Sequence, residues 1–308
     1  MERIILDVDT GHDDAVAIDM AAGCSLIKIE GIIATAGNTV LKNSLENTLN
    51  LTDALKLDAP VYAGSNGPLL RSQVTAGSIH GQNGFEGPVF GPRVKQVQDG
   101  NFIEFIIDTV MRNPGEISFV SVGPYTDLAI ALKAEPALAR NLKRIVLMGG
   151  SSTLGNVTSS AEFNIYADPE AAQIVFHSGA DIYLMPLDCT LNVVLNPEIQ
   201  QRLYSVGGKA IELFKASMTY YIESCRRYIH DYPAMHDPCC IAYLIDPQMF
   251  EFTNEEIDVE TKGDLAYGRT CLGRSLTDFN VHFARNVNTK RFWDVLCNSF
   301  QQLKERIG

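Results

Sequence analysis

Four aspartates lie close together near the start of the chain, and this spacing is the pattern in the sequence best suited to chemistry. They are Asp7, Asp9, Asp13 and Asp14. Carboxylates this close repel one another strongly unless they are solvated, protonated or share a cation. Hard cations such as Ca²⁺ and Mg²⁺ prefer carboxylate oxygens, and helix capping alone would need only one such residue. The cluster therefore predicts a metal site.

The elements on either side of the cluster explain how its acids would be positioned. An apolar run, Ile4-Ile5-Leu6, comes directly before it and is typical of a buried strand. Gly11 and a helix that begins near Asp13 follow. This order places the acids at the carboxyl end of a strand, where open α/β proteins bind their ligands. A helix N-terminus also favours carboxylates through its dipole.

The rest of the chain alternates short Val- and Ile-rich runs with amphipathic stretches. We expect strands at 3–8, 27–35, 117–122, 144–148 and 181–187, and further strands within 256–285. We expect helices that begin near 14, 39, 124, 168, 206 and 289. This alternation predicts an α/β fold, an open and mostly parallel sheet with helices on both faces. No linker divides the chain, so we expect a single domain over residues 1–308.

Composition narrows the class of protein. The formal net charge of −12 argues against binding to nucleic acid, because phosphate binding needs a basic surface. No apolar stretch approaches the roughly 20 residues that cross a bilayer, and no secretory signal is evident, so we expect no membrane partner and a cytoplasmic protein. The seven cysteines lack metal-binding spacing and are expected to be reduced thiols. The expected substrate is a small molecule.

Further polar residues recur at the predicted strand ends and in the loops. They are Asn38, His80, Asn156, Glu162, Asn164, His236 and Asp237. Each alone has a structural explanation: Asn156 beside Gly155 suits a turn, and Asp237 before Pro238 suits a helix N-cap. Together, at one edge of the sheet, they predict a pocket of carboxylates and amides that faces the aspartate cluster.

These motifs resemble the inosine-uridine preferring nucleoside hydrolases along essentially the whole chain. The family begins with a strand and a DxDPGxDDA motif, which residues 7–15 match as DVDTGHDDA. Further matches are Ala36-Gly37-Asn38, Ile79-His80-Gly81, Leu147-Met148-Gly149-Gly150, Ala161-Glu162-Phe163-Asn164-Ile165, Asp168-Pro169-Glu170-Ala171-Ala172 and His236-Asp237-Pro238. Two residues depart from the pattern. Thr10 replaces the usual Pro, which should loosen the turn slightly, and Asp127 replaces the usual Asn, which we expect near the edge of the site.

The resemblance implies a Rossmann-like nucleoside hydrolase fold and a bound Ca²⁺. The implied metal ligands are the side chains of Asp9, Asp14 and Asp237 and the backbone carbonyl of Val122. A water and two ribose hydroxyls would complete the coordination. Asp9 would also be the general base, taking the proton of the water that attacks C1′ of the ribose.

Binding of the sugar is implied in the same way. The residues expected to contact the ribose hydroxyls are Asp13, Asn38, Asn156, Glu162 and Asn164. Cleavage of an N-glycosidic bond passes through an oxocarbenium-like state, which an acidic pocket stabilises. Contacts that tighten in that state accelerate the reaction.

The departing base needs a hydrogen-bond donor. His236, next to a proposed metal ligand, is the first candidate and His80 is a plausible partner, because histidine titrates near neutral pH. Tyr228, His230 and Tyr232 are expected to close over the base. Segment 80–90 resembles members that favour pyrimidines, so uridine and cytidine are the expected substrates, with possible inosine activity. The family forms dimers and tetramers, and we expect one of these assemblies.

Two other functions compete with this one. Asp7 and Asp9 also fit the two acids of the DxDx(T/V) signature of haloacid-dehalogenase-like phosphatases, with Asp7 as nucleophile, Asp9 as acid/base and Mg²⁺ as cofactor. That alternative needs a strand-end hydroxyl, for which Ser121 would serve, but it also needs a Lys and a later acidic pair that we do not find. The second alternative is a nucleoside or ribose sensor without turnover. Release of free ribose distinguishes the enzyme from the sensor.

Overall fold

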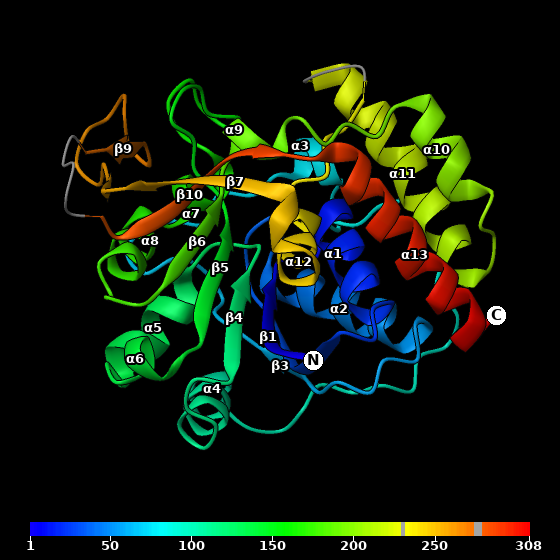
Figure 1. The fold of residues 1–308 in the computed structure, drawn as a ribbon, viewed down its shortest axis with the longest axis horizontal. Helices are drawn as coiled ribbons and strands as arrows, with labels where there is room; N and C mark the ends of the chain where they lie inside the picture. The colour runs from blue at the N-terminus through cyan, green and yellow to red at the C-terminus, as the bar shows by residue number, and fades with distance from the viewer. Residues whose placement is uncertain (229–231, 274–278) are drawn as a thin grey trace.

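The central feature of the computed structural model is a twisted sheet with helices on both faces (Figure 1). The structure describes residues 1–228, 232–273 and 279–308. Within them the sheet has eight strands in the order β3-β2-β1-β4-β5-β6-β10-β7. Their bounds are β1 Glu2–Val8, β2 Ile27–Ala34, β3 Val61–Ala63, β4 Ile117–Ser121, β5 Arg144–Met148, β6 Ile182–Met185, β7 Phe250–Glu255 and β10 Val281–Val287. A separate hairpin pairs β8 (Ile257–Val259) with β9 (Thr270–Leu272).

Neighbouring strands of the sheet run parallel except at one edge, where β10 and β7 are antiparallel. The predicted α/β fold with a mostly parallel sheet is therefore confirmed. β1 lies between β2 and β4. The strands β2 and β3 extend the sheet on one side of β1, and β4, β5 and β6 extend it on the other, so the strand order reverses at β1 and β4. Crevices at such a reversal, beyond the carboxyl ends of the strands, are the usual ligand sites of open α/β sheets.

The alternation of side chains along β1 explains how one strand serves two cores. Ile4, Leu6 and Val8 pack into the core on one face, while Ile5 packs into the core on the other. All four are fully buried. Because side chains of a strand alternate between faces, a strand that is apolar on both sides must be covered by helices on both sides.

The two faces carry different helices, which separate to the two sides of the sheet in Figure 1. The first face is covered by α1 His12–Ala22, α2 Leu41–Ala54, α10 Pro197–Tyr204, α11 Lys209–Tyr228, α12 Pro238–Ile245 and α13 Thr289–Ile307. The second is covered by α4 Phe102–Met111, α5 Thr126–Ala134, α6 Leu138–Asn141 and α8 Pro169–Phe176. The short helices α3 Gly77–His80, α7 Phe163–Ala167 and α9 Leu187–Thr190 and the 3₁₀ turn Pro247–Met249 lie in the connections.

Several elements differ from the sequence expectation. The long helix α11 begins at Lys209 and not at 206, because Gly207 and Gly208 have φ of 66° and 93°, outside the helical region. Helices α4 and α10 and strands β3 and β7 were not expected. The glycine-rich stretch 64–91 is irregular, as expected, but contains α3.

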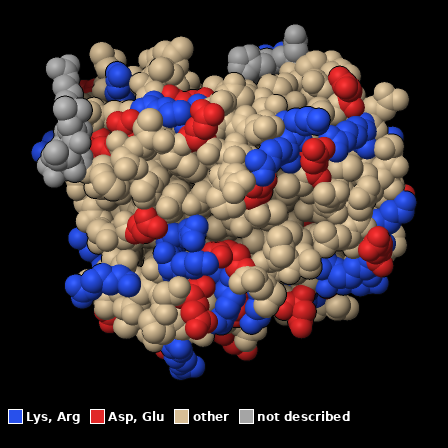
Figure 2. All heavy atoms as spheres, in the orientation of Figure 1, with Lys and Arg blue, Asp and Glu red and all other residues tan. Residues whose placement is uncertain are grey.

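The surface seen in Figure 2 carries Lys and Arg side chains interspersed with Asp and Glu. Among the described residues, every helix is too short or too polar to span a lipid bilayer.

Candidate active site

A cavity of about 320 Å³ lies at the carboxyl ends of the central strands. It is lined by ten residues that the sequence predicted for the site: Asp13, Asn38, His80, Val122, Asn156, Glu162, Asn164, Tyr228, His236 and Asp237. They come from segments far apart in the chain. The fold therefore brings the predicted carboxylates, amides and histidines to one place, although their chemical roles stay predictions.

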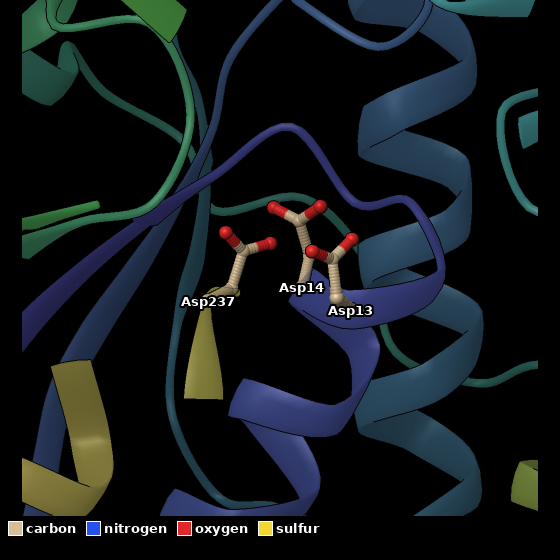
Figure 3. A group of neighbouring side chains, drawn as sticks. All are labelled: Asp13, Asp14 and Asp237. Atoms are coloured by element: carbon tan, nitrogen blue, oxygen red, sulfur yellow. The ribbon is translucent and has the colours of Figure 1, made fainter. Parts of the chain in front are cut away.

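At one side of the cavity three carboxylates converge (Figure 3). Asp13 and Asp14 lie in the first turn of α1, and Asp237 comes directly before α12. Ligand oxygens of the three residues lie within 4.8 Å of one another. Their side chains point toward a common centre, an arrangement that can hold a cation through oxygen atoms.

Local hydrogen bonds show that helix capping accounts for only part of this arrangement. Asp14 accepts hydrogen bonds from the backbone amides of Asp9 (3.0 Å) and Gly11 (2.9 Å), and so closes the start of α1. Asp237 occupies the N-cap position of α12, yet its side chain makes no capping hydrogen bond. Its carboxylate instead faces Asp13 and Asp14, so the N-cap explanation for Asp237 fails.

Asp9 lies beneath the cavity at the end of β1 and is held tightly. Its Oδ2 accepts a hydrogen bond from the backbone amide of Asn38 at 2.6 Å. Its Oδ1 is buried and has no hydrogen-bond partner among the described residues. Gly37 and Gly123 flank the carboxylate so closely that a Cβ on either would collide with it. The fold thus fixes one oxygen of Asp9 and leaves the other unpaired.

The electrostatics of the cluster favour a cation. Burial raises the pKa of Asp9 and of Asp237 well above the ordinary value, and neighbouring aspartates raise both further. Burial and the Asp14 carboxylate together raise the pKa of Asp13 to about 8. A bound cation would reverse this repulsion, because it stabilises the charged carboxylates.

Asp7 and Asp127 lie behind this cluster and apart from the cavity. Asp7 is fully buried and its Oδ2 accepts a hydrogen bond from Ser121 Oγ at 2.8 Å. Asp127 is also fully buried, and its Oδ1 accepts from the backbone amide of Ser65 at 2.8 Å. The expectation that Asp127 lies at the edge of the site is therefore wrong. Asp7 is not among the residues that line the cavity and is held by Ser121, so it is not placed as the nucleophile that the phosphatase alternative requires.

Thr10, the other departure from the family motif, is anchored to α2. Its hydroxyl lies 2.6 Å from that of Thr48, and its carbonyl accepts from Asn47 Nδ2 at 3.2 Å. Thr10 is fully buried. The hydroxyl thus supplies a tertiary contact that proline could not make.

The opposite wall of the cavity is built around α7. Asn164 Nδ2 donates to the carbonyls of Val122 (2.7 Å) and Met148 (3.1 Å), and so joins the ends of β4 and β5. Glu162 is the N-cap of α7 and accepts hydrogen bonds from the backbone amides of Asn164 (3.0 Å) and Gly150 (2.9 Å). Burial raises the pKa of Glu162 to about 7. Exposed Asn156 accepts from the backbone amide of Phe163 at 2.9 Å.

Two histidines face the cavity from different elements. His80 ends α3, where Gly81 turns the chain with a φ of 86°. Burial lowers the pKa of His80 well below its ordinary value, and nearby His12 and His236 lower it further, so its ring is neutral near pH 7. His236 Nδ1 lies 2.8 Å from Thr190 Oγ1. A neutral imidazole offers one N–H donor, so His80 suits hydrogen bonding better than proton delivery as a cation.

The two tyrosines that were expected to cover the base lie in different surroundings. Tyr228 lines the cavity and is 61% exposed. Tyr232 packs instead against Arg226, whose guanidinium carbon lies 5.2 Å from the centre of the tyrosine ring. His230 lies outside the described residues.

Sequence reasoning missed two aromatic residues next to the predicted site. Tyr221 of α11 lines the cavity, and His12 of α1 stacks on it with ring centres 4.9 Å apart. His12 stands inside the aspartate motif, but nothing in the spacing of the motif indicated a contact with α11. Tyr221 belongs to the buried face of a long amphipathic helix, where an aromatic residue is normally taken to be part of the hydrophobic core.

Comparison with known proteins agrees with this geometry. The family model "Inosine-uridine preferring nucleoside hydrolase" matches residues 4–294. The chain is 41% identical over 298 residues to the pyrimidine-specific ribonucleoside hydrolase RihB of Escherichia coli O17:K52:H18 (strain UMN026 / ExPEC), a match that covers 96% of this chain and 95% of the relative.

Solved structures of related proteins have the same fold. A purine-preferring ribonucleoside hydrolase from Gardnerella vaginalis superposes with a TM-score of 0.93 at 29% identity, covering 99% of this chain and all of that one. The plant nucleoside hydrolase PpNRh1 superposes with a TM-score of 0.90 at 27% identity, covering 97% and 99%. With an aspartate-lined cavity at the sheet reversal, the chain belongs to the inosine-uridine preferring nucleoside hydrolase family and is a ribonucleoside N-glycosidase.

Proposed function

We propose that this enzyme hydrolyses pyrimidine ribonucleosides, uridine and cytidine, to free base and ribose, with Ca²⁺ as its cofactor. The observation that carries the proposal is the convergence of Asp13, Asp14 and Asp237, with Asp9 close enough to Asp14 for the two carboxylates to repel each other. The name of the relative that is 41% identical supports the pyrimidine preference. The structural neighbour from Gardnerella, named purine-preferring, is less similar in sequence at 29% identity.

The donor set fits a hard divalent cation. Asp9, Asp14 and Asp237 would hold it with the carbonyl of Val122, which accepts from Asn164 and still has a second lone pair. Asp13 shares the cluster and would meet a ribose hydroxyl. When bound, Ca²⁺ would lower the pKa of a water and hold ribose hydroxyls. We expect calcium over a transition metal because every proposed ligand atom is oxygen.

Asp9 is the proposed general base. One of its oxygens is occupied by the Asn38 amide and the other has no partner among the described residues, so Oδ1 is free to accept a proton. As the water oxygen bonds to C1′, its proton passes to Asp9. The C1′–N bond breaks, and its electron pair leaves with the base.

The remaining polar residues would act on the two halves of the substrate. Asn38, Asn156, Glu162 and Asn164 line the cavity and would bind the ribose hydroxyls, and the surrounding acids would stabilise positive charge on the sugar. His236 and His80 would donate to the departing base, and Tyr228 would stack on it. An assembly of two or four copies remains our expectation.

The test is a reducing-sugar assay on uridine, cytidine, inosine and adenosine with added Ca²⁺. We expect ribose release to be fastest from uridine or cytidine. Faster release from inosine would overturn the pyrimidine preference, but the assignment as a nucleoside hydrolase would stand. Binding of nucleoside without any release would support the sensor.

A further inference from the structure

The hairpin of β8 and β9 stands outside the main sheet (Figure 1). It is held by α8, where the side-chain oxygen of Gln173 accepts a hydrogen bond from the backbone amide of Val259 at 2.7 Å. It also meets segment 149–166, in which Ser160 Oγ donates to the carbonyl of Leu265 at 3.2 Å. The hairpin therefore links a helix on the second face of the sheet to the segment that carries the proposed sugar-binding residues.

Thr270, the first residue of β9, makes a buried contact with the same segment. Its side chain is only 2% exposed, and its Oγ1 accepts a hydrogen bond from the backbone amide of Ser151 at 3.1 Å. Gly150 packs so closely on this hydroxyl that a Cβ would lie 2.8 Å from Oγ1. Gly150 has a φ of 72°, which glycine adopts without strain. The turn formed by Gly150 and Ser151 therefore rests directly on the Thr270 hydroxyl.

The backbone amide of Gly150 extends this contact to Glu162. It donates to Oε2 of Glu162 at 2.9 Å. The amides of Asn164 (3.0 Å) and Ile165 (3.3 Å) also donate to this carboxylate, but they belong to α7, the helix that Glu162 itself caps. Gly150 thus ties the carboxylate to the turn after β5. Two successive amides join the hairpin to the site, because one donates to Thr270 and the one before it donates to Glu162.

The stereochemistry of a ribonucleoside indicates which hydroxyl would reach Glu162. The 2′- and 3′-hydroxyls lie on one face of the ribose ring, and the 5′-hydroxyl projects from the other. In the proposed site the 2′- and 3′-hydroxyls face the cation beside Asp237, whereas Glu162 lies in the opposite wall of the cavity. Glu162 would therefore accept a hydrogen bond from the 5′-hydroxyl.

We propose that Thr270 is a positioning residue for recognition of the 5′-hydroxyl. Its hydroxyl holds the turn at Gly150, and the amide of that turn holds the Glu162 carboxylate in place. This inference rests on the proposed function, in which Glu162 binds a ribose hydroxyl. Thr270 is not among the residues that line the cavity, so it acts through the backbone and not by contact with the substrate.

The test is Thr270→Val, which keeps the shape of the side chain and removes the hydroxyl. Uridine and 5′-deoxyuridine differ only in the 5′-hydroxyl, so the ratio of their kcat/KM values measures its recognition. We expect wild type to favour uridine by about 10-fold or more, because the hydroxyl meets a carboxylate. Thr270→Val should lower this ratio by about threefold to tenfold, through a loss on uridine alone. Thr270→Ser keeps the hydroxyl and should restore the ratio.

Tyr267→Phe is the matched control, because it removes a different hydroxyl of the same hairpin, one that donates to Glu170 at 3.0 Å. It should keep the wild-type ratio. In all three variants Ca²⁺ should raise the melting temperature as it does in wild type, because the metal site is unchanged.

Four results would overturn the proposal. They are an unchanged ratio in Thr270→Val, equal losses on both substrates in that variant, an equal fall of the ratio in Tyr267→Phe, and equal turnover of the two nucleosides by wild type. If Thr270→Val does not fold, the same comparison on Thr270→Ala decides. Wild-type enzyme that releases sugar from neither nucleoside would refute the proposed function instead.

Discussion

The backbone amide of Asn38 donates a 2.6 Å hydrogen bond to Oδ2 of Asp9 and leaves Oδ1 of the same carboxylate without a partner among the described residues. A buried carboxylate oxygen without a partner is costly, because water is no longer available to solvate it. In the proposed site, Oδ1 of Asp9 is the atom that would contact the water and the cation. An unpaired oxygen at this position is what the proposed role of Asp9 as general base would require.

Cation binding should stabilise the folded enzyme, and Asp237 should be required for this. Saturation at about 100 times Kd would add about 2.7 kcal/mol to the free energy of unfolding. Asp237→Asn should raise the melting temperature without Ca²⁺, because one buried like charge is removed, and should lose most of the rise that Ca²⁺ produces. Differential scanning fluorimetry with Ca²⁺ and with chelator measures both.

Asp19→Asn is the matched control for that experiment, since Asp19 is a buried acid of α1, the helix that carries Asp13 and Asp14, and lies outside the cluster. It should keep the full Ca²⁺-dependent rise. An undiminished rise in Asp237→Asn would rule out Asp237 as a ligand.

Asp19 should also make stability depend on pH. Burial raises its pKa well above the ordinary value, and its Oδ1 has no partner among the described residues. The folded chain then holds a proton that the unfolded chain loses above about pH 3.9, so the free energy of unfolding falls as pH rises from there through the raised pKa. Asp19→Asn should therefore be more stable than wild type at neutral pH, by about 1–3 kcal/mol.

Urea unfolding of wild type and Asp19→Asn between about pH 4 and neutral pH measures how the difference in their free energies of unfolding changes with pH. The difference should shrink toward zero near pH 4, where both side chains are neutral. Glu305→Gln on the exposed side of α13 is the control and should show no such trend. A difference that is constant with pH would contradict the account.

Deoxyribonucleosides should be poor substrates. In the proposed site, a substrate without the 2′-hydroxyl would leave Asp13 and the cation without their partner. Sites that bind a substrate hydroxyl in this way reject an analogue that lacks it by about 10⁴-fold in kcat/KM. The measurement is sugar release from 2′-deoxyuridine. Uridine and 5′-deoxyuridine provide the comparison, and 5′-deoxyuridine should lose less because its metal-facing hydroxyls remain. Comparable turnover of uridine and 2′-deoxyuridine would argue against this pocket.

The two tyrosines near the end of α11 should behave differently. Tyr228 lines the cavity, whereas Tyr232 packs on Arg226. Stacking of a base on an aromatic ring is worth about 1–3 kcal/mol, so Tyr228→Ala should raise KM for uridine by about fivefold or more. Tyr232→Ala should change KM less. Steady-state kinetics of both variants decide, and a larger effect at Tyr232 would reverse the assignment.

The aspartate cluster could be predicted from the sequence because its parts are local. A strand, a turn and a helix start within residues 2–14 fix where Asp9, Asp13 and Asp14 lie. The expected role of Asp237 as a metal ligand depended on family resemblance, because its local pattern before Pro238 predicts a side-chain cap that the structure does not form.

Other features depended on tertiary packing and could not be predicted. The contact between His12 and His80 requires α1 and α3 to meet. Strand β7 lies at the edge of the sheet and, among the described strands, pairs with β10 alone, so its sequence, FEFTNE, carries a weak apolar signal. The burial of Asp127 beside Asp7 follows from the packing of α5, which the sequence did not reveal.

The most direct test of the central claim is ribose release from uridine by wild type and Asp9→Asn, each with Ca²⁺ and with chelator. Asn keeps the size of the side chain and cannot take a proton at neutral pH. The account predicts release by wild type that chelator abolishes and Ca²⁺ restores, and a loss of about 10²- to 10⁴-fold in the variant. Near-wild-type release by a folded Asp9→Asn, or release that chelator leaves unchanged, would contradict it.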